Sequence, residues 1–308
     1  MQRSIHTKPV FTFLLSLLLP ALLHAGHTEL SSRLAEVIEG KKAEVGIAVI
    51  IDGQDTVALN NNARYPTMSV YKFHQALALA DYMERQLLPF ETELPIAKSD
   101  LKPDTYSPLR QRYPQGGIKM SVAELLKYTL QQSDNNACDI LFRYQGGTDA
   151  VNRYIHSLGI TDCLISATEE EMHQDLERCY QNWTTPVAAA GLVDLFLRKP
   201  LFGKAYKDFI YQTMVECQTG KDRLPAPLTD KGVVIGHKTG TGGPNTQGQL
   251  IGTNDIGFIL LPNGHRYSIA VLVKDSEESP EVTSRIIADV SRVVYTYMMK
   301  LPAVQPAP

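Results

Sequence analysis

The chain has 308 residues, 44% of them hydrophobic, and is long enough to bury a substantial core. Lys and Arg number 30 and Asp and Glu 33, which gives a net charge of -3 at pH 7. This balance does not favour nucleic acid or an anionic membrane, and we expect neither as a partner. The 8 histidines and 4 cysteines show no metal-ligand spacing, so we expect no metal and no cofactor.

The N-terminus has the pattern of a secretory signal peptide. Basic Arg3 and Lys8 precede an apolar run over residues 10–23, and the small Ala25 follows it. The run is shorter than a membrane-spanning helix requires. We therefore expect residues 1–25 to be removed on export, which leaves a periplasmic protein without a membrane anchor.

Helical periodicity dominates the middle of the chain, and strand patterns lie towards both ends. The expected helices span residues 29–41, 70–85, 122–132, 136–144, 149–158, 186–197, 204–216 and 281–299. The expected strands span residues 45–51, 55–59, 233–238, 255–261 and 267–274, with turns at Gly53 and at Asn263-Gly264. This order predicts an α/β plus all-α fold: an antiparallel sheet, built from both chain ends and flanked by helices, with an inserted all-helical domain.

The domain boundaries follow from the same order. We expect residues 26–64 and 217–301 to form a discontinuous α/β domain, and residues 65–216 to form the inserted all-α domain. The Pro-rich residues 302–308 are expected to be disordered. A groove between two such domains is where a small ligand would bind. Nothing in the sequence requires more than a monomer.

The first of three motifs that carry chemistry contains a serine and a lysine. Ser69 and Lys72 are three residues apart on a predicted helix, so they lie on the same face. Lys72 is therefore placed to take the proton of a Ser69 nucleophile or to hold the electrostatics of the site. Backbone N–H groups at the helix start would favour negative charge on an attacked carbonyl oxygen.

The other two motifs complete a serine acyl-transfer site. In Ser133-Asp134-Asn135 the hydroxyl can relay a proton to a leaving nitrogen, and the amide of Asn135 can bind a lysine or a substrate carbonyl. Lys238-Thr239-Gly240 follows a predicted strand, so its cation suits a substrate carboxylate, and Gly240 allows close approach to the backbone. Each motif alone is weak, but all three in this order predict function.

Together the motifs resemble those of the class A β-lactamases and their penicillin-binding relatives. The resemblance runs from about Glu29 to Met299, and the stretches at residues 133–141, 236–241 and 254–262 are similar to the branch that contains extended-spectrum enzymes and cephalosporinases. It implies a serine hydrolase that opens the lactam amide of cephalosporins and penicillins, with a small-molecule β-lactam as its only partner.

The resemblance also assigns roles to residues. It implies that Ser69 is acylated, that Lys72 and Ser133 carry protons, and that the backbone N–H groups of Ser69 and Thr241 form the oxyanion hole. Residues expected to bind substrate are Asn135, Lys238, Thr239, Gly240, Thr241, Arg223, Tyr106 and His173. Among these, Arg223 resembles a second cation beside the motif lysine, and Tyr106 resembles the aromatic that walls the mouth of the site.

A β-lactamase also needs a base for hydrolysis of the acyl-enzyme. The family places a glutamate four residues before an asparagine in an Ω loop, and in the acidic, irregular stretch that matches it Glu169 stands four residues before His173. Glu169 is the predicted base, and Glu170 is the competing assignment. Many members clamp this loop by an Arg–Asp ion pair where this chain has Ala167 and Asn182. We expect no such pair, a wider cavity and tolerance of bulky cephalosporin side chains.

Some alternatives stay open at this stage. Cys138, Cys163, Cys179 and Cys217 could form disulfides in an oxidising compartment or could be buried thiols. A D-alanyl-D-alanine carboxypeptidase or transpeptidase shares the three motifs but would lack the deacylating glutamate. A β-lactam sensor that is acylated without turnover would need a membrane tether or a partner domain.

Overall fold

The structure is a computed structural model that describes residues 27–304. Its centre is an antiparallel sheet with the strand order β2-β1-β10-β9-β8. The strands are β1 (Glu44–Ile51), β2 (Asp55–Leu59), β8 (Val234–Thr241), β9 (Leu250–Leu260) and β10 (Arg266–Ser276). Strands from both ends of the chain form this one sheet, which confirms the predicted fold class.

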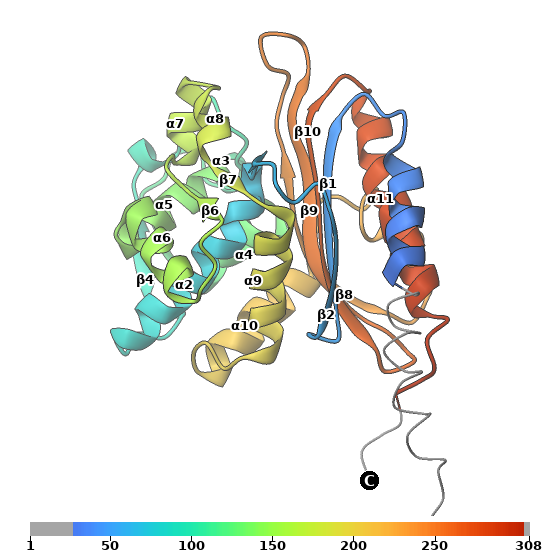
Figure 1. Cartoon of the computed structure of the whole chain (residues 1–308). Helices are drawn as coiled ribbons and strands as arrows, with labels where there is room; N and C mark the ends of the chain where they lie inside the picture. The colour runs from blue at the N-terminus through green and yellow to red at the C-terminus, as the bar shows by residue number, and fades with distance from the viewer. Residues whose placement is uncertain (1–26, 305–308) are drawn as a thin grey trace, which may run out of the picture.

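Helices cover both faces of the sheet (Figure 1). On one face lie the N-terminal helix, residues 27–38, and α11 (Pro280–Met298). The other face packs on α9 (Pro186–Arg198) and on the helical part of the molecule. Side chains of β1 alternate between the two, because successive residues of a strand point to opposite faces: Ile47 belongs to the core under α11, and Ala48 to the core shared with the helical part.

The helical part is built around α2 (Tyr71–Arg85), whose side chains are mostly buried. Its other helices are α3 (Pro108–Arg112), α4 (Val122–Gln131), α5 (Asn135–Gln145), α6 (Gly147–Ser157), α7 (Glu169–Gln174), α8 (Arg178–Gln181) and α10 (Lys204–Val215). The predicted helices agree with the structure to within a few residues at each end. The boundaries assigned to the two domains stay a prediction, since the helical part and one face of the sheet share a continuous core.

Short elements in this part were not predicted. Two small sheets are present, β3-β7-β6 and β4-β5. Their strands are β3 (Tyr65–Pro66), β4 (Glu93–Ile96), β5 (Ile118–Ser121), β6 (Cys163–Leu164) and β7 (Trp183–Thr184), and the 3₁₀ turns are η1 (Met68–Val70), η2 (Lys98–Asp100) and η3 (Ala226–Leu228). Strands of two to four residues carry too little periodicity to be read from a sequence.

The acidic stretch expected to be irregular is partly helical, which corrects the prediction. It contains α7 and α8. The reason is local, because Thr168 and Glu171 form a capping box at the start of α7. At the C-terminus, residues 302–304 of the tail expected to be disordered are held by the β9–β10 turn: Val304 N donates to Asn263 O at 2.9 Å. Residues 305–308 lie outside the described part.

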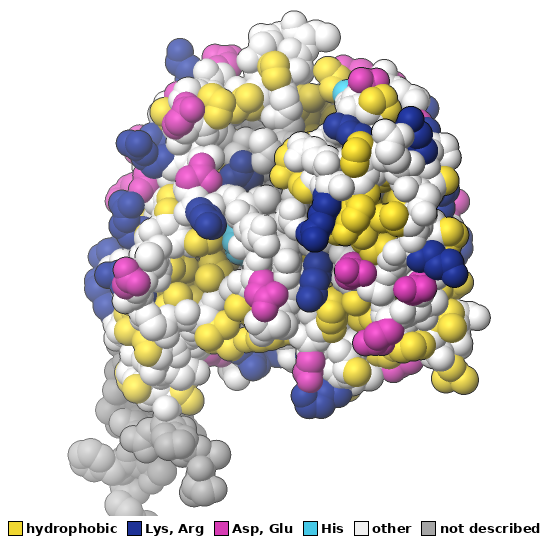
Figure 2. Space-filling view, turned by 180° about the vertical axis from the view of Figure 1, so that it is seen from behind, with side chains coloured by type: hydrophobic (Ala, Val, Ile, Leu, Met, Phe, Trp, Pro, Cys, Tyr) yellow, Lys and Arg dark blue, Asp and Glu magenta, His cyan; other side chains and the backbone are white. Residues whose placement is uncertain are grey.

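The surface seen in Figure 2 mixes Lys and Arg with Asp and Glu side chains. Among residues 27–304 no helix is long and apolar enough to cross a bilayer. The predicted signal peptide, residues 1–25, lies outside the described residues.

Phe258 of β9 tests the shared core. Its ring is fully buried and stacks on Tyr211 of α10, with the ring centroids 4.8 Å apart. We expect Phe258→Ala to lower the free energy of unfolding by about 3–5 kcal/mol through lost contacts and a cavity. Urea denaturation measures this, with Leu176→Ala as the control, because Leu176 is exposed and should change stability by no more than about 0.5 kcal/mol. Equal losses of stability in the two variants would contradict the placing of Phe258 in the shared core.

Candidate active site

Ser69 lies in the 3₁₀ turn η1, directly before α2. The residues that lead to it are held from two sides. The Asn254 amide, from the sheet, donates to Pro66 O at 2.7 Å and to Thr67 O at 3.1 Å. From the helical part, Asn182 O accepts the backbone N–H of Thr67 at 2.8 Å. The position of Ser69 is thus set by both halves of the molecule.

Lys72 is fully buried and makes three polar contacts. Its Nζ lies 2.8 Å from Ser133 O, 2.6 Å from Asn135 Oδ1 and 2.9 Å from Glu169 Oε1. An ammonium group has three N–H donors, so these acceptors satisfy it completely. Ser69 Oγ donates to the same Glu169 Oε1 at 3.3 Å. The hydroxyl of Ser69 therefore donates its hydrogen bond to Glu169 and not to Lys72.

The second motif is positioned by Asp134, the N-cap of α5. Its buried carboxylate accepts hydrogen bonds from Ala137 N, from Leu109 N and from the Ser107 hydroxyl. These bonds fix the loop so that Ser133, at a φ of 60°, turns towards the site. Asn135, directly after the cap, presents its amide to Lys72 as predicted and also donates to Thr105 Oγ1 at 2.7 Å.

Glu169 is the first residue of α7, and a carboxylate from α5 holds that helix start. Asp139 Oδ1 and Oδ2 accept the backbone N–H groups of Glu169 and Glu170, both at 2.9 Å. Burial, and after it the charge of Glu169, raises the pKa of Asp139 to about 7. The Glu169 carboxylate, 9% exposed, then points at Ser69 and Lys72.

The neighbouring residues of α7 point elsewhere. Glu170 forms an ion pair with Lys102 at 3.0 Å, away from Ser69, which disfavours it as the base. His173 is exposed and lines a separate cavity of about 140 Å³ beside Lys102. The expectation that His173 binds substrate is thus not supported by its position, because only the first turn of α7 reaches the site.

The third motif is on β8, the edge strand of the sheet. Lys238 Nζ donates to Ser133 Oγ at 2.9 Å and so joins the sheet to the second motif. Burial, and after it the nearby charge of Lys72, lowers the pKa of Lys238 to about 7. Gly240 passes so close to the nucleophile's segment that a Cβ there would lie 2.6 Å from Thr67 O and 3.2 Å from Ser69 N, which explains the glycine.

Arg223 lies beside β8, but most of its donors are used within the protein. One terminal nitrogen donates to Gly240 O and Asn254 O, both at 2.9 Å, and the other donates to Thr241 Oγ1 at 2.7 Å. Both terminal nitrogens of the predicted second cation are therefore bonded within the protein, so the guanidinium does not present a free planar fork to a substrate carboxylate. It positions Thr241 and contributes positive charge to the wall of the site.

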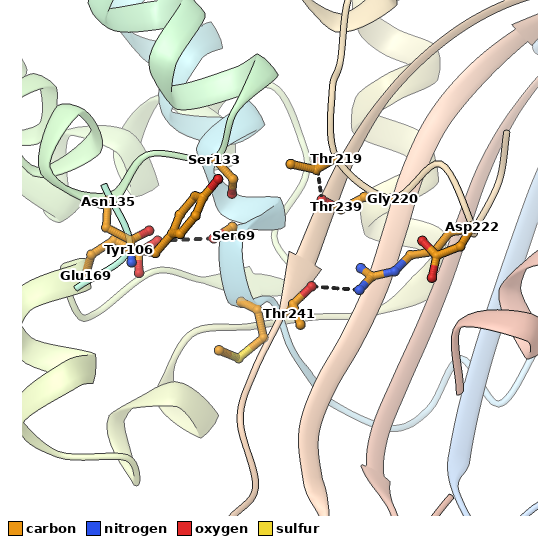
Figure 3. Close-up of a pocket in the computed structure, with 12 residues that line it drawn as sticks. Ser69, Tyr106, Ser133, Asn135, Glu169, Thr219, Gly220, Asp222, Thr239 and Thr241 are labelled. Atoms are coloured by element: carbon orange, nitrogen blue, oxygen red, sulfur yellow. Dashed lines mark hydrogen bonds between the residues drawn. The ribbon is translucent and has the colours of Figure 1, made fainter. Parts of the chain in front are cut away.

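These residues surround a cavity of about 370 Å³ (Figure 3). It is lined by Met68, Ser69, Tyr106, Ser133, Asn135, Glu169, Thr219, Gly220, Asp222, Arg223, Thr239 and Thr241. Tyr106 is 57% exposed and so stands at the rim, as predicted. Lys72 and Lys238 lie behind the lining and act on the cavity through the groups they contact.

A model of the β-lactamase enzyme family matches residues 29–298. The chain belongs to that family. The β-lactamase of Bacteroides uniformis is 43% identical over 272 residues, 88% of this chain and 92% of the relative. The β-lactamase VEB-1 of Pseudomonas aeruginosa is 37% identical over 296 residues, 95% of this chain and 98% of the relative.

Solved structures agree with the family assignment. The TLA-3 extended-spectrum β-lactamase superposes with a TM-score of 0.86 at 42% identity, covering 89% of this chain and 99% of its own. A class A β-lactamase from Bacteroides cellulosilyticus reaches a TM-score of 0.85 at 42% identity, covering 89% and 98%. These matches confirm the resemblance to class A enzymes. The roles of single residues of this β-lactamase stay predictions.

The loop that carries Glu169 is clamped by one amide in place of an ion pair. Asn182 is fully buried, and its Oδ1 accepts the N–H groups of Ser166 at 2.7 Å and Ala167 at 2.9 Å. Its Nδ2 donates to Ala167 O at 2.8 Å. The sequence predicted that an Arg–Asp pair is absent at positions 167 and 182, but not that Asn182 holds this segment or that Arg178 pairs with Glu171 at 3.1 Å elsewhere in the loop.

Other residues of the site were not predicted. Thr219 and Gly220 line the cavity, and Thr219 Oγ1 lies 2.7 Å from Thr239 Oγ1. In the sequence, only the position of Thr219 and Gly220 in a turn close to Arg223 could have indicated that they belong to the site. Asp139 gave none, because a helical aspartate shows no sign of a partner distant in sequence. The cysteines are free in the described residues: Cys138, Cys163 and Cys179 are buried, and Cys217 is partly exposed.

Asn182→Ala tests the clamp. It leaves the buried N–H and C=O of Ala167 without partners, so we expect the free energy of unfolding to fall by about 3 kcal/mol. Urea denaturation measures this loss. Gln174→Ala is the control, since its exposed side chain lies in the same loop but outside the clamp and should change stability by no more than about 0.5 kcal/mol. A loss of similar size in both variants would show that the amide is not the clamp.

Proposed function

We propose that this β-lactamase hydrolyses cephalosporins and penicillins through an acyl-enzyme on Ser69 that a Glu169-activated water resolves. The observation that carries the proposal is the shared Oε1 of Glu169, which contacts both Ser69 Oγ and Lys72 Nζ. A carboxylate held by a buried cation beside a serine is placed to accept the proton of that serine or of a water molecule.

The acylation step follows from the same contacts. Ser69 Oγ attacks the lactam carbonyl and passes its proton to Glu169, while Lys72 keeps its three acceptors and its positive charge. The C–N bond breaks and Ser133 protonates the leaving nitrogen, while Lys238, which donates a hydrogen bond to the Ser133 hydroxyl, replaces that proton. Glu169 releases the proton of Ser69 to solvent and Lys238 takes one up, so that both groups return to their starting charges before deacylation. Backbone N–H groups of Ser69 and Thr241 stabilise the oxyanion.

Deacylation uses Glu169 again. Once Ser69 Oγ carries the acyl group it has no proton to donate, so its hydrogen bond to Glu169 is lost and a water molecule takes that place. The Glu169 carboxylate then removes a proton from the water as it attacks the ester carbonyl. The bond between the carbonyl carbon and Ser69 Oγ breaks, and Glu169 returns the proton to Oγ, which restores the serine. The carboxylate of the substrate lies near Thr239, Thr241 and the charges of Lys238 and Arg223.

The relatives support a broad range of cephalosporins. TLA-3 and PER-1 are both described as extended-spectrum β-lactamases, and the Asn182 clamp in place of an ion pair allows a different loop shape. We therefore propose that bulky cephalosporin side chains are accepted. Export to the periplasm and action as a monomer belong to the same proposal and rest on the sequence alone.

A comparison of the variants Glu169→Gln and Glu170→Gln tests which glutamate is the base for deacylation. We expect residues 26–308 of the parent to turn over an excess of a chromogenic cephalosporin many times. In Glu169→Gln we expect Lys72 to accept the proton of Ser69 during acylation, but no base remains for deacylation. The variant should therefore give one stoichiometric burst followed by a rate lower by about 10²–10⁴-fold. Glu170→Gln should keep the parent rate, since Glu170 pairs with Lys102 outside the cavity. Absorbance against time, read from the first seconds, separates burst from turnover.

Other outcomes of this experiment are informative. Full turnover by Glu169→Gln, or a defect confined to Glu170→Gln, would reject Glu169 as the base. A lone burst in the parent as well would indicate a penicillin-binding enzyme or a β-lactam sensor, and would overturn the hydrolytic proposal itself.

The charge of Lys238 should make kcat/KM depend on pH. Its pKa of about 7 is below the ordinary value for lysine, so in the free enzyme its charge is present below pH 7 and is lost as pH rises through 7. We expect kcat/KM for an anionic β-lactam to fall above that pH, by up to about tenfold per pH unit. Lys238→Arg should keep a flat profile, since arginine stays protonated. Identical profiles of parent and variant would show that another group titrates.

A further inference from the structure

A second cavity lies in the helical part, away from the catalytic groups. It has a volume of about 630 Å³ and lies between the C-terminal half of α2, the end of α5, α6 and the segment between α9 and α10. Of these helices, α5 and α6 are on the side of the helical part farthest from the sheet (Figure 1). The cavity is lined by Asp81, Tyr82, Arg85, Gln145, Ala150, Arg153, Tyr154, Ser157, Leu158 and Leu201. None of these residues lines the catalytic cavity.

Gln145, the last residue of α5, is buried in the wall of this cavity. The residue is only 5% exposed, and neither its Oε1 nor its Nε2 has a hydrogen-bond partner among the described residues. Buried side-chain amides are almost always paired, because the loss of water without a replacement partner is unfavourable. Two unpaired atoms on one side chain, beside a cavity of the size that holds small molecules, indicate a ligand.

A second unpaired group lines the same cavity. The hydroxyl of Tyr154, on α6, is buried and likewise has no partner within residues 27–304. Burial, and after it the charge of Asp81, raises the pKa of Tyr154, so the hydroxyl stays protonated and can donate a hydrogen bond. Unpaired polar groups from α5 and α6 thus meet at one cavity.

The charged residues of the lining favour an anionic group. Arg85 and Arg153 are both exposed, which places them at the mouth of the cavity. Arg85 forms an ion pair with Asp81, which lies one turn earlier on α2. Asp81 is the only acidic residue of the lining, so the two arginines leave one positive charge in excess. A guanidinium group binds a carboxylate better than other side chains do, because its planar donors match both oxygens.

A primary amide is the group that best satisfies Gln145. Its carbonyl can accept a hydrogen bond from Nε2 while its N–H donates to Oε1, and the hydroxyl of Tyr154 can donate to the same carbonyl. The side chains of Leu158 and Leu201 supply apolar surface for a short carbon chain between this amide and a charged group at the mouth.

We propose that this cavity binds a small carboxylate that carries a primary amide, with the amide paired to Gln145 and Tyr154 and the carboxylate to Arg153. The site is separate from the catalytic one. Lys72 lies in the first turn of α2, and Asp81 lies about 14 Å further along the helix at about 1.5 Å per residue. The inference does not depend on the proposed hydrolysis, because the ligand is not a substrate of that reaction.

The first experiment measures binding of succinamate and glutaramate to the intact enzyme at pH 7. These probes carry the amide and the carboxylate at two different spacings. A titration followed by saturation-transfer NMR should show that at least one of them binds with a dissociation constant of about 1 mM, as suits a molecule of about eight non-hydrogen atoms. Succinamide, which lacks the charge, and butanoate, which lacks the amide, should bind at least about tenfold more weakly.

The variant Gln145→Met tests whether the probe binds in this cavity. Methionine has a similar volume but no hydrogen-bond donor, so affinity should fall by about tenfold or more. The midpoint of thermal unfolding should stay the same or rise by about 2 °C, because two unpaired buried atoms are removed. A glutamine with a purely structural role would lower the midpoint instead. Gln86→Met, at the exposed end of α2, is the control and should change neither quantity.

Two further variants test the other groups. Tyr154→Phe removes only the hydroxyl and should also weaken binding of the probe without loss of thermal stability. Arg153→Gln should weaken binding of the carboxylate probes and leave that of succinamide unchanged, since succinamide carries no charge.

Three results would overturn the proposal. They are no saturable binding of either probe, which would leave the cavity to solvent alone, an affinity that Gln145→Met does not change, and equal affinities for the probe, succinamide and butanoate. Binding that needs the amide, the carboxylate and Gln145 would establish the site.

Discussion

The buried ammonium group of Lys72 is the interaction on which the site depends. A charge with no access to water is tolerated only when its donors are all satisfied, and here the acceptors come from Ser133, Asn135 and Glu169. Two of the acceptors, Ser133 and Asn135, lie at the start of α5, and the third, Glu169, lies at the start of α7. The helix α2, which carries Lys72, must therefore meet both helix starts at one point. Loss of Glu169 would leave the charge without its counter-ion, and loss of either neutral acceptor would leave a buried N–H without a partner. The catalytic groups are in this way linked to the stability of the helical part.

A second constraint joins this assembly to the sheet. The edge strand β8 approaches the backbone at Ser69 so closely that only glycine fits at position 240. Lys238 bonds to Ser133 across the same gap, and Asn254 holds the carbonyls of Pro66 and Thr67. The cavity is therefore bounded by two bodies that share a hydrophobic core and several buried hydrogen bonds, and its width is fixed by backbone contacts as much as by side chains.

The parts that the sequence predicted are those with local signals. Periodicity located the long helices and the main strands, and the motif spacing located Ser69, Lys72 and Lys238. The missed features depend on partners distant in sequence: Asp139 holds α7, and Asn182 clamps the loop. The capping box of Thr168 and Glu171 was a local signal for α7 that the acidic composition obscured. The position of His173 does not support the predicted contact with substrate, because a motif offset fixes a distance along the chain and not which turn of a short helix faces the site.

The first and last helices of the described chain lie side by side on the sheet face opposite the helical part (Figure 1). The two ends of the fold are thus neighbours, and the sheet separates them from the catalytic cavity. A short peptide that joined them, with new ends opened in a surface loop, would leave every contact around Ser69 in place. The architecture is for that reason suited to circular permutation and to attachment at either end to a surface or a second protein.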